Sequence, residues 1–418
     1  MKREPGEVNC CTRPLFCNTR AARLALCLAI VVLPGIRARA AEPLFEGNTA
    51  FAFDLYSRLK EQEGNLFFSP YSISTCLAMT YAGARSETEK QMASVLHFNQ
   101  KQDQLHSAFG DVQRQLNEAG SRKGVELNIA NALWAQKEHP FVPEFVKVAR
   151  NQYGAQLNQV DFATQADAAI QEINRWVEDK TKDRIQDILA PGSLDDMTRM
   201  VLVNAIYFKG SWVKRFEKSA TFPQPFHLNK ARTTDVPMMD HADTVKYVED
   251  NTIQAVELPY EGNQISMVIL LPKDIEGCGK LESLLSPRNL STWLKAMRSQ
   301  KVILFLPRFK MESSFDLSSE LEKMGMLDAF LFKKADFSGM DGTTDLFISR
   351  VAHKAWVEVT EEGTEAAAAT AVVAITASAN QPPPPPIFRA DHPFIFLIRH
   401  NRSGSILFLG RLADPASK

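Results

Sequence analysis

The sequence predicts an α+β fold with large sheets, because helical patterns fill the first half of the chain and strand patterns fill most of the second. Apolar residues recur at helical spacing before residue 200. After it, nearly continuous apolar runs are typical of strands that are covered on both faces. Helices followed mostly by strands indicate an α+β architecture.

Three helices are predicted in the first half. The first has an apolar residue at every fourth position from 51 to 59, with caps available at 48 and 49, and Gly64 is placed to end it. The second begins at Ser69-Pro70 and continues to Gly83, because serine is a favoured cap and proline suits the first helical position. The third is an amphipathic pattern from 166 to 177.

Strands are predicted in the second half at 200–208, 265–271, 302–306, 393–398 and 405–409. Helical patterns at about 279–297 and 316–325 interrupt them. Asn204 is the one strongly polar residue in the first of these runs. A buried amide without a partner costs roughly 1–3 kcal/mol. We therefore expect Asn204 to have hydrogen-bonding partners on other elements.

Length and composition favour one large globular domain. The chain has 418 residues, a formal net charge of -1 and 45% hydrophobic residues, a profile without a general bias towards nucleic acid. No repeat and no linker rich in proline, glycine or serine interrupts the chain before a proline tract at 382–386.

The N-terminal residues 1–41 are predicted to be a signal peptide. Basic residues precede an apolar stretch at 24–33, and Ala38-Arg39-Ala40 fits a small-x-small cleavage pattern. This predicts a secreted, extracellular protein, or a periplasmic one in a bacterial host, with a folded domain at 42–418 that does not contact a membrane. An uncleaved anchor is the alternative, although the apolar run is short for one.

Cysteine and histidine usage excludes several kinds of site. Only Cys76 and Cys278 lie beyond the signal segment, so no disulfide framework is expected. The histidines form no H-x-x-x-H pair, and there is no C-x-x-C, G-x-S-x-G or phosphate-binding glycine motif. The sequence therefore predicts no metal, no cofactor and no enzymatic activity, which favours a protein that is acted upon.

The segment 366–379, AAAATAVVAITASA, contains no charge, proline or glycine. Its alanines also suit a surface helix, and a low-complexity linker is a further alternative, whereas fourteen residues are too few for a membrane span. Small residues followed by β-branched ones fit a chain that is first an exposed loop and later a buried strand.

Four blocks of sequence resemble the serpin family, and they occur in the family's order. They are NLFFSPYSIS at 65–74, LVNAIYFKGSW at 202–212, EEGTEAAAAT at 361–370, and DHPF at 391–394 with FLGR at 408–411. The resemblance extends from about 45 to 412, and the closing region is most similar to the branch that includes leukocyte elastase inhibitor.

The resemblance implies a metastable fold with about nine helices, three sheets and an exposed reactive-centre loop at about 361–390. It also implies a mechanism in which a target serine or cysteine protease cleaves this loop as a suicide substrate. The protease is trapped as an acyl-enzyme when the cleaved loop inserts into the main sheet. Such a protein acts as a monomer on a protease partner, and not on nucleic acid.

Site residues are carried over by position from the resemblance. The hinge residues are Glu361, Gly363, Thr364, Glu365, Ala366, Ala367, Ala368, Ala369 and Thr370. The reactive bond would join Ala377 to Ser378, and a small alanine before the cut suits an elastase-like pocket. Cuts after Val373, Ile375 or Thr376 remain alternatives, as does a plain linker role for Ala377.

The resemblance also assigns residues at the loop base and beneath the sheet. Arg308 would pair with Glu361, although an ordinary exposed pair is the alternative. The sheet-opening cluster would comprise Ser69, Ser72, Asn204 and His353, with Trp212 near the top of the sheet. Plain core packing would equally explain Trp212.

Two features bear on function and target. The tract at 381–386 makes the stretch after the reactive bond longer than is usual in the family, which puts the exact cleavage position in doubt. The competing function is that of a non-inhibitory serpin acting as a carrier or chaperone. Such relatives usually have bulky, charged or proline residues in the hinge, and the set that would face the core here is small and uncharged.

Overall fold

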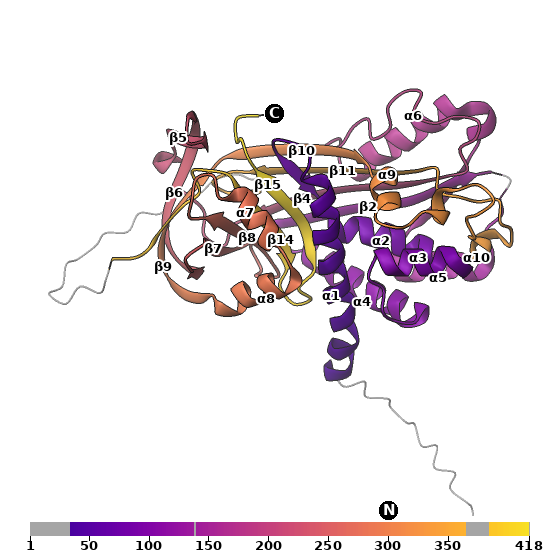
Figure 1. The fold of residues 1–418 in the computed structure, drawn as a ribbon, viewed down its shortest axis with the longest axis horizontal. Coiled ribbons are helices and arrows are strands. Elements are labelled where there is room, and N and C mark those ends of the chain that lie inside the picture. The colour runs from indigo at the N-terminus through magenta and orange to yellow at the C-terminus, as the bar shows by residue number, and fades with distance from the viewer. Residues whose placement is uncertain (1–33, 138, 365–383, 418) are drawn as a thin grey trace, which may run out of the picture.

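The computed structural model describes residues 34–137, 139–364 and 384–417. The α+β class is confirmed: helices dominate the first half of the chain and pack on sheets formed mainly by the second (Figure 1). The helices of the described part are α1 Pro34–Leu59, α2 Pro70–Tyr81, α3 Ser86–Val95, α4 Gln102–Gly120, α5 Pro143–Tyr153, α6 Phe162–Lys180, α7 Cys278–Leu284, α8 Pro287–Ala296, α9 Ser318–Lys323 and α10 Ser338–Asp341, with 3-10 turns η1 Lys218–Ala220 and η2 Asp328–Phe330.

A six-stranded sheet forms the centre of the molecule. Its order is β10-β11-β4-β2-β3, and the short β12 pairs with β4 beside it. The bounds are β2 Val125–Gln136, β3 Gln156–Val160, β4 Met200–Ser211, β10 Phe309–Asp316, β11 Arg350–Val359 and β12 Gly363–Thr364.

A nine-stranded sheet has the order β1-β15-β14-β8-β7-β6-β9-β13, with β5 beside β6. The bounds are β1 Leu66–Phe68, β5 Phe222–Asn229, β6 Arg232–Glu249, β7 Ile253–Pro259, β8 Ile265–Pro272, β9 Arg298–Pro307, β13 Ile387–Arg389, β14 Phe394–His400 and β15 Ile406–Leu412. The long β6 pairs with β5, β9 and β7, so strands that could form two sheets are joined into one here.

Strand β4 is buried on both faces, as its continuous apolar run predicts. The side chains of Leu202, Ile206 and Phe208 belong to the main core with α2, whereas Val201 and Val203 pack in a second cluster with α6. Figure 1 shows α6 on one face of the six-stranded sheet and α2 on the other. Alternate residues of any strand added beside β4 would therefore enter two different cores.

Local signals explain several element boundaries. Ser69 caps α2 by accepting a hydrogen bond from the Ser72 amide, and Pro70 occupies the first helical turn. The helical pattern at 279–297 is divided into α7 and α8, because Pro287 starts a new helix. Helix α1 begins at Pro34, well before the predicted start, and continues through the predicted cleavage position. Among the helices described, none combines the length and apolar character needed to cross a membrane.

Candidate functional site

Most of the predicted loop lies outside the described residues. These undescribed positions are Glu365, Ala366, Ala367, Ala368, Ala369, Thr370, Ala377 and Ser378. The structure describes both flanks, from Glu361 to Thr364 before the gap and from residue 384 after it. The site is therefore built from the base of the loop and from the sheet beneath it.

The structure brings Arg308 and Glu361 together at the base of the loop. Arg308 Nε donates to Glu361 Oε1 at 2.7 Å, and a second guanidinium nitrogen contacts the same oxygen. The Thr221 hydroxyl also donates to this oxygen, at 2.6 Å. Glu361 is only 1% exposed, so this is not an ordinary surface pair. Burial alone raises the pKa of Glu361, but the hydrogen bonds from Arg308 and Thr221 outweigh it and hold the pKa below its usual value.

Gly363 starts a two-residue strand at the top of the sheet. Gly363 pairs with Ser211 and Thr364 pairs with Gly210, both antiparallel to β4. Its φ of 138° is in the region that favours glycine, and a Cβ at this position would lie 2.0 Å from the Gly210 carbonyl oxygen. The close approach therefore requires glycine.

Below this point the sheet is closed, because β11 pairs in parallel with β4. The ladder runs from Arg350 opposite Val201 to Trp356 opposite Tyr207, and it places His353 directly opposite Asn204. Any strand that enters between β4 and β11 must separate this ladder.

The four predicted members of the sheet-opening cluster meet beneath the ladder. The His353 Nδ1–H donates to Asn204 Oδ1, and His353 Nε2 accepts from the Ser69 amide at 3.0 Å. The Asn204 amide donates to the Ser72 hydroxyl and to Asn131 Oδ1. The Ser72 hydroxyl donates in turn to Asn131 at 3.2 Å. The expected partners of Asn204 are thus supplied by α2, β2 and β11.

The cluster uses a neutral imidazole. His353 is fully buried, and burial lowers its pKa to about 3, although the contact with Asn204 acts in the opposite direction. Protonation of Nε2 would also remove the acceptor for the Ser69 amide. The hydrogen bond from the Ser69 amide therefore requires a neutral His353.

The sequence prediction missed Asn131. It lies on β2 directly opposite Asn204. The signal was present, because Asn131 interrupts an apolar run just as Asn204 does.

Trp212 contacts the base of the loop. Its ring stacks on Tyr260 with centroids 4.5 Å apart, and its indole N–H donates to the Thr360 carbonyl at 3.1 Å. Its backbone amide donates to the Glu362 carbonyl at 2.8 Å. Trp212 is buried, but its contacts with the loop base go beyond plain core packing.

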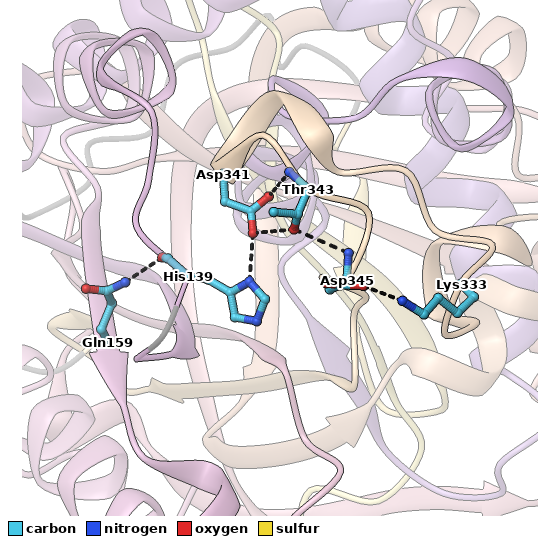
Figure 2. Close-up of polar contacts among 6 residues, drawn as sticks. All are labelled: His139, Gln159, Lys333, Asp341, Thr343 and Asp345. Atoms are coloured by element: carbon cyan, nitrogen blue, oxygen red, sulfur yellow. Dashed lines mark hydrogen bonds and ion pairs between the residues drawn. The ribbon is translucent and has the colours of Figure 1, made fainter.

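A second polar cluster lies at the opposite end of the six-stranded sheet (Figure 2). His139 Nδ1 lies 2.7 Å from Asp341 Oδ2, and the Thr343 hydroxyl donates to that same oxygen at 2.8 Å. The imidazole and the hydroxyl share one carboxylate and do not lie in series, so this is not the relay of a hydrolase. Nor does the described part of the chain contain three or more histidine, cysteine or acidic residues grouped to hold a metal ion.

Residues 46–415 match the family model described as serpin (serine protease inhibitor). The chain belongs to the serpin family. Leukocyte elastase inhibitor of Homo sapiens is 45% identical over 384 residues, which cover 90% of this serpin and 100% of the relative. The protein of that name from Equus caballus is 44% identical with the same coverage.

Solved serpins share the fold. Uncleaved ovalbumin superposes with a TM-score of 0.80 at 32% identity, covering 89% of this serpin and all of ovalbumin. Human thyroxine-binding globulin gives a TM-score of 0.82 at 32% identity, covering 90% of this serpin and all of the globulin. Because a thyroxine-binding globulin shares this fold with the elastase inhibitors' family, the fold alone does not assign function.

The prediction of a secreted protein is wrong. The leukocyte elastase inhibitors align over their whole length with 90% of this serpin, and the family match starts at residue 46. They therefore have no counterpart to the segment interpreted as a signal peptide, of which 1–33 lies outside the described residues. The pattern at 38–41 misled because alanine is small enough for a cleavage site and is also the best helix former. In the structure it forms part of α1.

We expect the pH dependence of stability to report the neutral His353. An unfolded histidine takes up a proton below about pH 6.5, whereas the native His353 does so only near pH 3. The free energy of unfolding should therefore fall as the pH falls from 6.5 towards 3. In His353→Gln, the slope of the free energy of unfolding against pH, between pH 6 and 4, should be smaller than in the wild type by about 1.4 kcal/mol per pH unit.

Denaturant unfolding at a series of pH values measures this slope. Ser72→Ala is the matched control, because it weakens the same cluster without removing a titratable group. It should lower stability at every pH by a similar amount. Equal slopes in the wild type and in His353→Gln would show that His353 titrates normally.

Proposed function

We propose that this serpin inhibits an elastase-like serine protease as a suicide substrate, by inserting its cleaved loop between β4 and β11. The observation that carries the proposal is β12, whose two residues already pair with β4 just above the closed ladder. The loop is thus held at the entrance of the position that an inserted strand would take. The role requires no nucleophile from the serpin, because the protease supplies its own.

The register of β12 defines the path of insertion. Continued along β4, it brings Ala366 opposite Phe208, Ala368 opposite Ile206 and Thr370 opposite Asn204. The bridge between Thr360 and Gly363 gives a register along β11, and this second register brings Thr370 opposite His353. Since His353 and Asn204 oppose each other now, the two registers agree.

Side-chain alternation explains why this hinge can enter the sheet. Directly opposed residues share a face, so Ala366, Ala368 and Thr370 would enter the main core. None of them is large or charged, which disfavours the alternative of a carrier or chaperone. Glu365, the one charged residue after Thr364 in the hinge, would face the other side opposite Lys209.

The inserted loop would also exchange polar contacts at the cluster. Insertion at Thr370 separates His353 from Asn204, which would leave two buried polar groups without each other. The Thr370 hydroxyl can donate and accept at that position. The residue type at 370 therefore suits the pair that it displaces.

Length and target preference follow from the sequence of the loop. Fourteen residues at about 3.3 Å each would move an attached protease roughly 45 Å.

We place the reactive bond between Ala377 and Ser378, with cuts after Val373, Ile375 or Thr376 as alternatives. A small residue before the bond suits an elastase-like pocket, and the name of the relatives, leukocyte elastase inhibitor, supports the same class of target. We further propose that the serpin acts as a monomer and that it also inhibits a cysteine protease.

Incubation with neutrophil or pancreatic elastase tests the proposal. We expect a covalent band near the summed mass on a denaturing gel, together with loss of elastase activity, because the acyl-enzyme survives denaturation. Catalytically inactive elastase is the control and should give no such band. Cleavage of the serpin with full retention of elastase activity would refute inhibition.

Substitution Thr364→Arg should convert the inhibitor into a substrate. Position 364 lies opposite Gly210 at the entrance of the path, so insertion would bury an arginine with no partner. An unpaired buried charge costs several kcal/mol, enough to slow insertion about a hundredfold or more. The measurement is the ratio of cleaved to complexed serpin. Thr364→Val, similar in volume and uncharged, should keep the wild-type ratio, and a normal ratio in Thr364→Arg would argue against insertion along this path.

Substitution Ala377→Arg should redirect inhibition towards trypsin-like proteases. An arginine before the reactive bond cannot enter a small apolar pocket but suits one that contains a carboxylate. The association rate constants for trypsin and for elastase should change in opposite directions, by about a hundredfold or more each. If neither changes, the reactive bond lies elsewhere, and mass spectrometry of the released C-terminal peptide then locates it.

A further inference from the structure

Glu362 has a buried carboxylate that the sequence analysis did not single out. The residue is 3% exposed. Lys218 Nζ lies 2.8 Å from its Oε1, and Arg215 Nη1 lies 3.8 Å from its Oε2. Neither oxygen has a partner with the angles of a hydrogen bond among the described residues, so charge attraction alone compensates its burial. A buried carboxylate held in this way depends strongly on its cations.

Both cations come from the segment 212–221, which directly follows β4. The same segment fixes the backbone of the loop base: the Trp212 amide donates to the Glu362 carbonyl and the Phe216 amide to the Glu361 carbonyl, each at 2.8 Å. Glu362 is therefore tied to the end of β4 immediately before β12 begins. Its neighbour Glu361 instead pairs with Arg308, which precedes β10 on the other side of the opening.

The inserting strand has a sequence that sets its own register poorly. Ala366, Ala367, Ala368 and Ala369 are identical, so a shift of one residue leaves the packing of this stretch almost unchanged. The same shift would turn Glu365 from the face of Lys209 into the main core. The correct register must therefore be fixed before the alanines enter.

We propose that Glu362 is a positioning residue whose ion pairs with Lys218 and Arg215 fix the register in which the cleaved loop enters the sheet. This inference rests on the proposed inhibitory function. The anchor holds the backbone at 362, so Gly363 meets Ser211 and each later residue follows in step. Without the ion pairs of Glu362, a fraction of the loops begins to pair with β4 in a shifted register and inserts slowly. Those molecules release the protease and remain as cleaved serpin.

The test is a double-mutant cycle of Glu362→Gln and Lys218→Met, measured with excess elastase. The ratio of cleaved to complexed serpin should rise about tenfold in each single variant, which corresponds to about 1.4 kcal/mol in the barrier that separates the two outcomes. The double variant should show no more than the larger single effect, because both changes remove one interaction. Lys214→Met is the matched control: this lysine lies in the same segment but pairs with Asp243, and its ratio should not change.

A second measurement reports the register itself. Cleaved wild-type serpin should unfold in one thermal transition at high temperature. Cleaved Glu362→Gln should show an additional transition at lower temperature, from molecules whose loop is inserted in a shifted register. Thermal unfolding of the uncleaved variants shows whether they are folded. If Lys218→Met is not folded, the comparison of Glu362→Gln with the wild type tests the inference alone.

The outcomes distinguish this inference from the proposed function. If the wild type forms a covalent complex but the variants keep its ratio and its single transition, the register role is wrong and the inhibitory function stands. A ratio below that of the wild type would mean that the ion pairs oppose insertion, which also overturns the inference. If the wild type forms no complex at all, the proposed function fails first.

Discussion

The parallel pairing of β11 with β4 is the contact on which the rest of the structure depends. It closes the six-stranded sheet directly below β12, between two parallel strands that an antiparallel strand could pair with on both sides. The ladder carries a polar pair, His353 and Asn204, at its centre instead of an apolar one. Apolar residues of similar volume would hold the sheet closed without the requirement that each polar atom keep a partner. The polar pair makes the ladder stable when complete and costly when half broken.

The base of the loop places the incoming chain against this ladder. Two adjacent carboxylates are tied in different directions, Glu361 to Arg308 and Glu362 to Lys218. Both carboxylates are buried, whereas Arg308 and Lys218 remain partly exposed, so each ion pair compensates the burial of its carboxylate. Only a glycine at position 363 permits the close approach to Gly210. The ion pairs of Glu361 and Glu362 and the pairing of β12 with β4 therefore fix one continuous stretch of backbone, 361–364.

The sequence predicted buried strands such as β4 and β8 and helices such as α2 and α6, because their patterns are local, but it did not predict β11. It also predicted that Asn204 needs partners, but periodicity could not say which, since Ser72 and His353 are 132 and 149 residues away. Resemblance to the family identified Ser72 and His353 as partners of Asn204, and it identified the pair of Arg308 with Glu361. It did not supply Lys218, which stands among other basic residues such as Lys214 and Arg215 in a segment without regular spacing. At the N-terminus the alanine pattern fits a cleavage site and a helix alike, and the relatives, not the pattern, overturned the prediction of a secreted protein.

The position of the polar pair along the path has a mechanistic consequence. In the proposed insertion the loop enters from Thr364 downward, so Ala366 and Ala368 would enter before Thr370 reaches Asn204. Each alanine buries a single methyl group, worth about 0.8 kcal/mol, and so contributes little to opening the sheet. The early part of insertion therefore gains its free energy mainly from backbone pairing, while the pair at the centre still resists. Once Thr370 replaces the lost contact, the β-branched residues that follow add apolar burial to each further step. The sequence of the loop thus places its weakest packing before the polar pair and its strongest packing after it.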